Sequence, residues 1–293
     1  CYTIKSIALP ENLRYIGNGA FTECLHLYKV YNDSALSVAR GDAYTNGGVA
    51  QYALNVRGKG ETIPSATAGG FNFMLSDDET PIAYLIGYGG ESPSATVPDK
   101  ITFGGVAYTA YELAPRAFWY PEGEIGLTSA DFGSAITAIR SRAFYGNSFI
   151  ENITVGNSLG VIESEAFIGC IALKSFAFAG SSVDEIGANA FESCSSLATV
   201  AFTGGATVGK IGQAAFNNCT ALTGIALPEG LTTIGNSAFG NCRSMKTVSF
   251  PSTLVSIGTY AFNGCASLAK AALPQNLTEI PYGAFMGCAS LET

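Results

Sequence analysis

A repeated Ala-Phe pair dominates the sequence. One copy of the repeat runs from Leu222 to Cys242 and has the skeleton L-x-x-I-x-L-P-x-x-L-x-x-I-G-x-x-A-F-x-x-C. The phenylalanine of the pair recurs at Phe21, Phe118, Phe144, Phe167, Phe191, Phe216, Phe239, Phe262 and Phe285. From Phe144 onward, successive copies are 23 to 25 residues apart. A period of this length is typical of solenoids, in which each repeat forms one coil of a continuous stack.

The apolar spacing within one repeat predicts a strand, a return segment and a turn. Ile225 and Leu227 are two residues apart and point to the same side of a strand, which Pro228 ends because proline cannot donate to a ladder. Residues 231–235 form the return segment, and A-F-x-x-C has the spacing of one helical or 3-10 turn. We therefore predict an α/β repeat: a right-handed leucine-rich-repeat solenoid with a parallel β-sheet on one face and short helical or 3-10 turns at A-F-x-x-C.

The cysteines follow the same period as the phenylalanines. Seven of the eight lie three residues after a repeat Phe: Cys24, Cys170, Cys194, Cys219, Cys242, Cys265 and Cys288. Stacked coils would align these side chains as an inward ladder with rungs about 4.8 Å apart. Parallel side-chain vectors make poor disulfide geometry, so we predict buried free thiols. Cys1 fits the same phase, and we favour a boundary inside a repeat over the lipidated cysteine of a mature lipoprotein.

The distribution of the repeat predicts four parts of the chain. Residues 1–31 match the repeat and form the tail of an N-terminal leucine-rich-repeat array, whereas residues 32–70 lack the marker and are predicted to be a connector. In residues 71–110, apolar residues alternate on both sides of a polar turn, which predicts a β-hairpin that caps the array. Residues 111–293 are the main solenoid.

These repeats resemble a known family, the BspA-like leucine-rich-repeat proteins of bacterial cell surfaces. The resemblance rests on the A-F-x-x-C repeats within residues 1–31 and 71–293, and on the Thr-Val-Pro and Gly-Gly-Val-Ala-Tyr phrases between Phe71 and Phe118. It implies an extracellular location at the bacterial cell surface and adhesion to a host or bacterial partner. It implies no ligand residues, because the matched positions are core positions.

The charged and polar residues favour a non-enzymatic protein. A net charge of −8 does not predict the basic surface that nucleic acid requires. His26 is the one histidine and therefore the one candidate base for a hydrolase triad, and we interpret it as structural. There is no C-x-x-C motif and no run of about 18 apolar residues. We predict no cofactor, no metal, no nucleic-acid partner and no transmembrane segment in this chain.

Recognition of a partner is the remaining function. The outward strand positions, such as Ser175 and Ala177, are small and neutral, whereas binding hot spots are enriched in Trp, Tyr and Arg. The candidate binding residues are therefore Tyr111, Trp119, Tyr120, Lys29 and Tyr31, with core packing of the aromatic ones as the alternative. We predict a non-catalytic adhesion or protein-interaction scaffold. The alternatives are a glycan-binding module, in which Trp119 stacks on a sugar, and a structural spacer.

Overall fold

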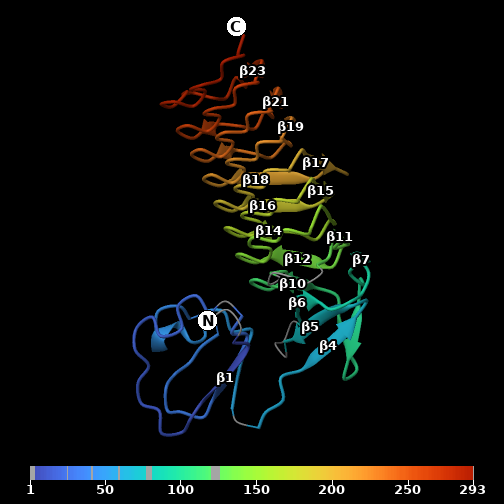
Figure 1. The fold of residues 1–293 in the computed structure, drawn as a ribbon, viewed down its shortest axis with the longest axis vertical. Helices are drawn as coiled ribbons and strands as arrows, with labels where there is room; N and C mark the ends of the chain where they lie inside the picture. The colour runs from blue at the N-terminus through green and yellow to red at the C-terminus, as the bar shows by residue number, and fades with distance from the viewer. Residues whose placement is uncertain are drawn as a thin grey trace.

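The protein is an elongated stack of coils with its N-terminal part folded against one end of the stack and its C-terminus at the other (Figure 1). The computed structural model describes residues 4–24, 26–40, 42–58, 60–76, 81–119 and 126–292. Regular structure in these residues is almost entirely β-strand, and the one 3-10 segment among them is Asn46–Gly48. The stack is therefore a β-solenoid.

Coils of the main array contribute strands to two sides of the stack. One side is built, in spatial order, by β10 (Tyr111–Leu113), β12 (Ile136–Ile139), β14 (Val161–Ile162), β16 (Ser182–Ile186), β18 (Thr207–Ile211), β20 (Thr233–Ile234) and β22 (Ser256–Ile257). The other side is built by β7 (Ser94–Thr96), β11 (Ser129–Asp131), β13 (Asn152–Val155), β15 (Ser175–Ala179) and β17 (Thr199–Thr203), and then by β19 (Gly224–Ala226), β21 (Thr247–Ser249) and β23 (Lys270–Ala272). All pairs between neighbouring coils are parallel.

The prediction of strands on one face is therefore incomplete, because the return segment also forms a sheet. Ile211 of β18 pairs with Ile234 of β20, so equivalent residues of successive coils lie side by side. Both side chains are buried, and a buried backbone must satisfy its N–H and C=O groups. Pairing with the next coil provides those hydrogen bonds on this side as well.

The A-F-x-x-C segments form the remaining side of each coil and carry a ladder of aromatic rings. From Phe118 to Phe285, consecutive rings stack with centroids 4.5 to 5.3 Å apart. Beside them, each thiol from Cys170 to Cys288 donates to the carbonyl of the preceding coil's Phe, at 3.0 to 3.2 Å. The cysteines of the described residues are free thiols.

Asn147 stands in the cysteine position of its coil and makes the same contact. Its Nδ2 donates to the Phe118 carbonyl at 2.6 Å, and its Oδ1 accepts from the backbone N–H groups of Phe149 and Ile150. The side chain is only 2% exposed. An amide therefore replaces the thiol as donor and adds a cap for the following turn.

The helical or 3-10 turns predicted at A-F-x-x-C are not confirmed, and the backbone shows why. In the coil of Phe167, the residues two before and two after it, Glu165 and Gly169, have φ of 61° and 72°. These left-handed residues interrupt any helix. The N–H groups of all three residues donate to the next coil, Phe167 to Ala190 O at 2.7 Å. The segment is therefore a turn whose backbone continues the ladder between coils.

The N-terminal residues form a smaller array with its own core. β1 (Ser6–Leu9), β2 (Lys29–Asn32) and β3 (Asn55–Arg57) pair in parallel, in that order. β3 lies in the segment predicted to be a connector, so that segment includes a further coil. We call residues 4–57 the N-terminal array.

An antiparallel unit joins the two arrays in the sequence. β4 (Ser65–Ala68), β5 (Phe71–Leu75) and β6 (Ala83–Tyr88) are successive antiparallel neighbours, and β6 also pairs in parallel with β10. A two-stranded pair of β8 (Ile101–Phe103) and β9 (Val106–Tyr108) follows. The polar turn predicted at residues 76–80, between β5 and β6, lies outside the described residues except for Ser76. These strands place the N-terminal array beside the first coil of the main array.

Candidate binding cleft between the two arrays

The N-terminal array meets the first coil of the main array through buried polar contacts. His26 Nε2 lies 3.0 Å from the Arg116 carbonyl oxygen, and Tyr28 Oη donates to the Pro115 carbonyl at 2.5 Å. Burial raises the pKa of the Tyr28 phenol well above its usual range. In the next coil, the equivalent carbonyl of Arg142 accepts a backbone N–H, that of Arg116, from the coil before it. The Arg116 carbonyl accepts from the His26 ring instead, so His26 takes the place of a preceding coil. His26 Nε2 is the donor of this bond, because a carbonyl oxygen only accepts.

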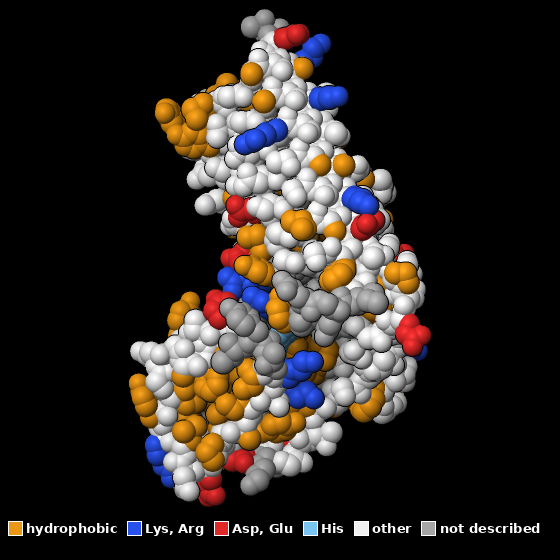
Figure 2. All heavy atoms as spheres, viewed as in Figure 1, with side chains coloured by type: hydrophobic (Ala, Val, Ile, Leu, Met, Phe, Trp, Pro, Cys, Tyr) orange, Lys and Arg blue, Asp and Glu red, His pale blue; other side chains and the backbone are white. Residues whose placement is uncertain are grey.

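Arg142 of the second coil ties this junction together. Arg142 pairs with Glu165 of the next coil at 2.6 Å and with Glu23 of the N-terminal array at 2.5 Å. The hydrogen bond to Glu165, supported by the charges of both carboxylates, raises the pKa of Arg142 although partial burial opposes this. Figure 2 shows basic and acidic side chains beside one another where the two arrays meet, and further charged side chains spaced along the stack.

Arg140 lies between two carboxylates from the coils on either side. Its guanidinium contacts Glu112 at 2.7 Å and Glu163 at 2.5 Å. Partial burial disfavours the charge, but the hydrogen bonds to Glu163 and Glu112 outweigh it and raise the pKa of Arg140. Glu112 lies on β10 and Glu163 directly follows β14, so stacking of coils alone aligns the three groups.

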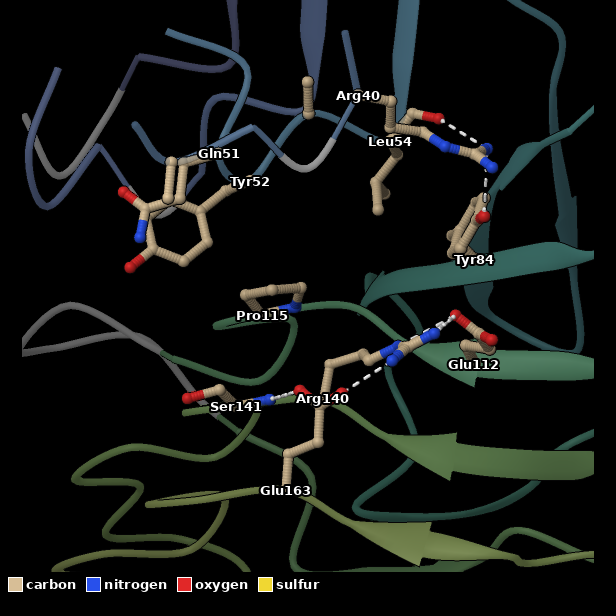
Figure 3. A pocket seen from close by; sticks show the side chains of 12 residues that line it. Arg40, Gln51, Tyr52, Leu54, Tyr84, Glu112, Pro115, Arg140, Ser141 and Glu163 are labelled. Carbon is tan, nitrogen blue, oxygen red and sulfur yellow. Dashed lines mark hydrogen bonds and ion pairs between the residues drawn. The ribbon is translucent and has the colours of Figure 1, made fainter. Parts of the chain in front are cut away.

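A cleft of about 480 Å³ opens between the two arrays at this point (Figure 3). Gln51 and Tyr52 lie on the side of the N-terminal array, and Arg140 lies on the opposite side. Arg40 lies at the rear, where its guanidinium donates to the Tyr84 hydroxyl at 3.2 Å. The cleft thus combines aromatic rings with two cations and two carboxylates from three separate parts of the chain.

Charged side chains of the cleft are engaged with one another. Both of its carboxylates accept hydrogen bonds from Arg140. His26 is engaged at the junction and does not line the cleft. Among the described residues, no group of three His, Cys, Asp or Glu side chains is placed to hold a metal ion.

No helix of the described residues is both long enough and apolar enough to cross a membrane.

The aromatic residues predicted to bind a partner have separate environments. Tyr111 is 0% exposed and packs on Phe73 with ring centroids 5.1 Å apart, so it belongs to the core and is removed from the candidate surface. Burial raises the pKa of its phenol to about 12. Trp119 is half-buried at the junction, with its ring centroid 5.7 Å from that of His26 and 5.6 Å from the Arg116 guanidinium. Tyr120 lies outside the described residues.

Lys29 and Tyr31, the two remaining predicted residues, lie on β2 and are half-buried. Tyr31 packs against the large hydrophobic cluster that runs through the main array and also includes Tyr28 and Leu54 of the N-terminal array. Lys29 lines a different groove, together with Lys5. The structure therefore does not bring these residues together with Trp119 in one site.

The cleft residues Arg40, Tyr52 and Tyr84 were not predicted. Arg40 and Tyr52 lie in a stretch without the repeat marker, and Tyr84 looked like one of several alternating hairpin residues. The contact between Arg40 and Tyr84 joins residues 44 positions apart. It does not recur in other coils, so the spacing of the repeat cannot predict it.

The parallel strands, the stacked Phe ring ladder and the coil period define a leucine-rich-repeat solenoid. A family model described as the BspA type leucine rich repeat region matches residues 1–50, 116–209 and 200–293 in six copies. The chain belongs to this BspA-type family.

Solved structures of other bacterial proteins are similar to this chain. The leucine-rich-repeat protein of T. pallidum is 25% identical over 71% of this chain and 92% of its own, with a TM-score of 0.54, which supports the fold. A leucine-rich cell surface protein of Faecalibacterium prausnitzii is 22% identical over 79% of this chain and 82% of its own, with a TM-score of 0.38. A leucine-rich-repeat protein of Eubacterium ventriosum is 19% identical over 97% of this chain and 59% of its own, with a TM-score of 0.45. No curated protein matches the chain.

Proposed function

We propose that this chain is a non-catalytic module of a bacterial cell-surface or secreted protein, and that it mediates adhesion by binding another protein in the cleft between its two arrays. Membership of the BspA-type family supports the bacterial surface location and the interaction role. The cleft supplies the site, because it is hollow and is lined by both arrays.

The observation that carries this proposal is the distribution of side chains known to dominate protein interfaces. Tyr and Arg are enriched at binding hot spots. Tyr52, Arg40 and Arg140 all line the cleft. The exposed strand positions of the main array are small instead, as at Thr199 on β17 and Thr247 on β21. A partner protein therefore gains more from the cleft than from the long sheet.

The hairpin of β5 and β6 is proposed as the cap of the main array. β6 pairs with β10 of the first coil, so the hairpin occupies the side of that coil on which no further main-array coil stacks. Phe71, Phe73 and Leu75 of β5 are fully buried. The four-part division of the chain also stays a proposal, with residues 32–57 assigned to the N-terminal array.

The glycan-binding alternative was predicted at Trp119, and the environment of that side chain does not favour it. Trp119 contacts His26 and Arg116 within the chain, so its ring is already engaged. The spacer alternative predicts that no side chain of the cleft matters for binding. Both differ from the proposal in the outcome of one experiment.

The experiment is a binding screen of the full chain against arrayed host matrix proteins and bacterial surface proteins. Tyr52→Ala removes a half-buried cleft ring, and Tyr44→Ala is the matched control, because Tyr44 is 94% exposed and does not line the cleft. We expect the signal to weaken with Tyr52→Ala and to persist with Tyr44→Ala, while both variants melt like the parent. A screen without any protein ligand, or equal signals from the two variants, would overturn the proposal.

A further inference from the structure

A second groove, of about 400 Å³, separates the N-terminal array from the β4–β5–β6 unit. One wall carries Lys5 and Lys29, and the opposite wall carries Ser65, Thr67 and Asn72. We call these five residues the lysine groove. Its volume falls within the roughly 300–1,000 Å³ typical of sites for small ligands.

The two lysines are close neighbours, because Lys5 directly precedes β1 and Lys29 begins the adjoining β2. The N–H of Lys29 donates to the carbonyl of Lys5 at 3.2 Å, and Lys29 pairs in register with Ser6, the residue after Lys5. Within the described chain, neither ammonium group lies within ion-pair distance of a carboxylate; the ion pairs found there use other cations. Two cations that no described carboxylate neutralises therefore face one groove in a chain whose net charge is −8.

The opposite wall also offers hydrogen-bond donors. Thr67 Oγ1 donates to Asn72 Oδ1 at 3.0 Å, which holds the amide and leaves its NH₂ group available to a ligand. Ser65 is exposed and adds a hydroxyl. With the ammonium groups, the groove thus presents donors from both walls, which matches a ligand rich in oxygen acceptors.

The charge of this groove differs from that of two other hollows of the molecule. The cleft between the arrays balances Arg40 and Arg140 against two carboxylates, and the hollow beside β14 and β16 is lined by Glu163 and Glu185. Among the residues that the structure describes, no acidic side chain lines the lysine groove. An anion is therefore favoured here and disfavoured at the acidic hollow.

We propose that the lysine groove binds an acidic saccharide, a sugar that bears a carboxylate or a sulfate. The ammonium groups would hold the acidic group, and the hydroxyl and amide groups would hold the sugar hydroxyls. Ala66 and Ile86, which also line the groove, offer an apolar floor for the C–H face of the ring. A short acidic peptide carries backbone carbonyl acceptors as well as carboxylates, and it is therefore the competing ligand in the test. This site is separate from the cleft between the arrays and does not depend on the function proposed for that cleft.

The test is a calorimetric titration of the full chain with 3′-sialyllactose, with N-acetylglucosamine 6-sulfate, with lactose and with hexaglutamate. The two acidic sugars distinguish a carboxylate from a sulfate, lactose is the uncharged control, and hexaglutamate represents an acidic peptide. The variants are Lys5→Gln and Lys29→Gln, and the matched control is Lys270→Gln, an exposed lysine at the far end of the stack.

We expect at least one acidic sugar to bind, to bind more weakly as salt is added, and to lose about tenfold in affinity with each groove substitution. Lactose should bind far more weakly, and Lys270→Gln should change nothing. The proposal fails if neither acidic sugar binds, if lactose binds as well as they do, or if Lys270→Gln has the same effect. Binding of hexaglutamate alone would assign the groove to acidic peptides instead. A failed protein screen with a successful titration would overturn only the function proposed for the cleft.

Discussion

Removal of one rung from the Phe ring ladder tests the packing on which the fold depends. Phe239 is 0% exposed, and its ring stacks on Phe216 and Phe262 with both centroid distances at 5.2 Å. Truncation of a buried Phe to Ala costs about 3–5 kcal/mol. Each aromatic pair adds about 0.5–1.5 kcal/mol beyond burial, and two pairs are lost here. We therefore expect Phe239→Ala to lower the free energy of unfolding by about 4–8 kcal/mol.

The assay is urea denaturation followed by circular dichroism, with Thr247→Ala as the matched control. Thr247 is exposed on β21 of the neighbouring coil, and such a substitution changes stability by about 0.5 kcal/mol or less. Because coils contact mainly their neighbours, amide exchange should also quicken around Phe239 before it quickens at Phe144. Equal effects of the two substitutions would refute the assigned orientation of the repeat.

Three further perturbations test other contacts. Burial raises the pKa of the Cys288 thiol to about 11, so its alkylation by iodoacetamide should quicken about tenfold per pH unit from pH 8 toward 11, and a plateau near pH 9 would contradict this. The thiol of an unfolded chain ionises near pH 8.5, so the buried Cys288 thiol contributes stability that is complete below that pH and is lost as the pH rises through about 11. Urea denaturation at increasing pH should therefore show a falling free energy of unfolding over this range. Asn147→Ala should lower the free energy of unfolding by about 2–4 kcal/mol, because the Phe118 carbonyl and two backbone N–H groups lose their partners. Asn147→Cys should cost less, because a thiol can still donate to the Phe118 carbonyl. Equal shifts in melting temperature for the two variants would contradict this. Glu23→Gln breaks a half-exposed ion pair with Arg142 and should cost less than about 1 kcal/mol in urea denaturation, and a cost of several kcal/mol would show tighter coupling of the arrays.

The leucine-rich-repeat class and the burial of the repeat residues could be predicted because the repeat imposes the same environment on equivalent residues. A residue such as Phe239 has a counterpart one coil away on each side, so its spacing alone shows that it stacks. The same reasoning applies to Cys219, whose thiol lies beside the ladder and donates to the Phe191 carbonyl. The alternation that predicted the hairpin is also local, because residues on one face of a strand are two apart.

Backbone conformation inside the coil could not be read from that period. The spacing of A-F-x-x-C fits a helical turn, but left-handed residues such as Glu165 and Gly169 send the N–H groups to the next coil instead. The return segment likewise pairs with its neighbours and forms a second sheet. Spacing reports which side chains face inward, whereas the hydrogen-bond partner of each backbone group depends on the neighbouring coil.

The sequence by itself determined the stack and its inward residues, whereas only the tertiary structure decided where the two arrays meet and what they enclose. His26 reaches the Arg116 carbonyl across 90 residues, and Arg142 reaches Glu23 across 119. Each contact occurs once, so no counterpart in another coil reveals it. Contacts that occur once also explain three further features. They are the burial of Tyr111, the cleft beside Tyr52 and the presence of two lysines in one groove. A period encodes contacts that recur, and these candidate binding sites arise from contacts that do not.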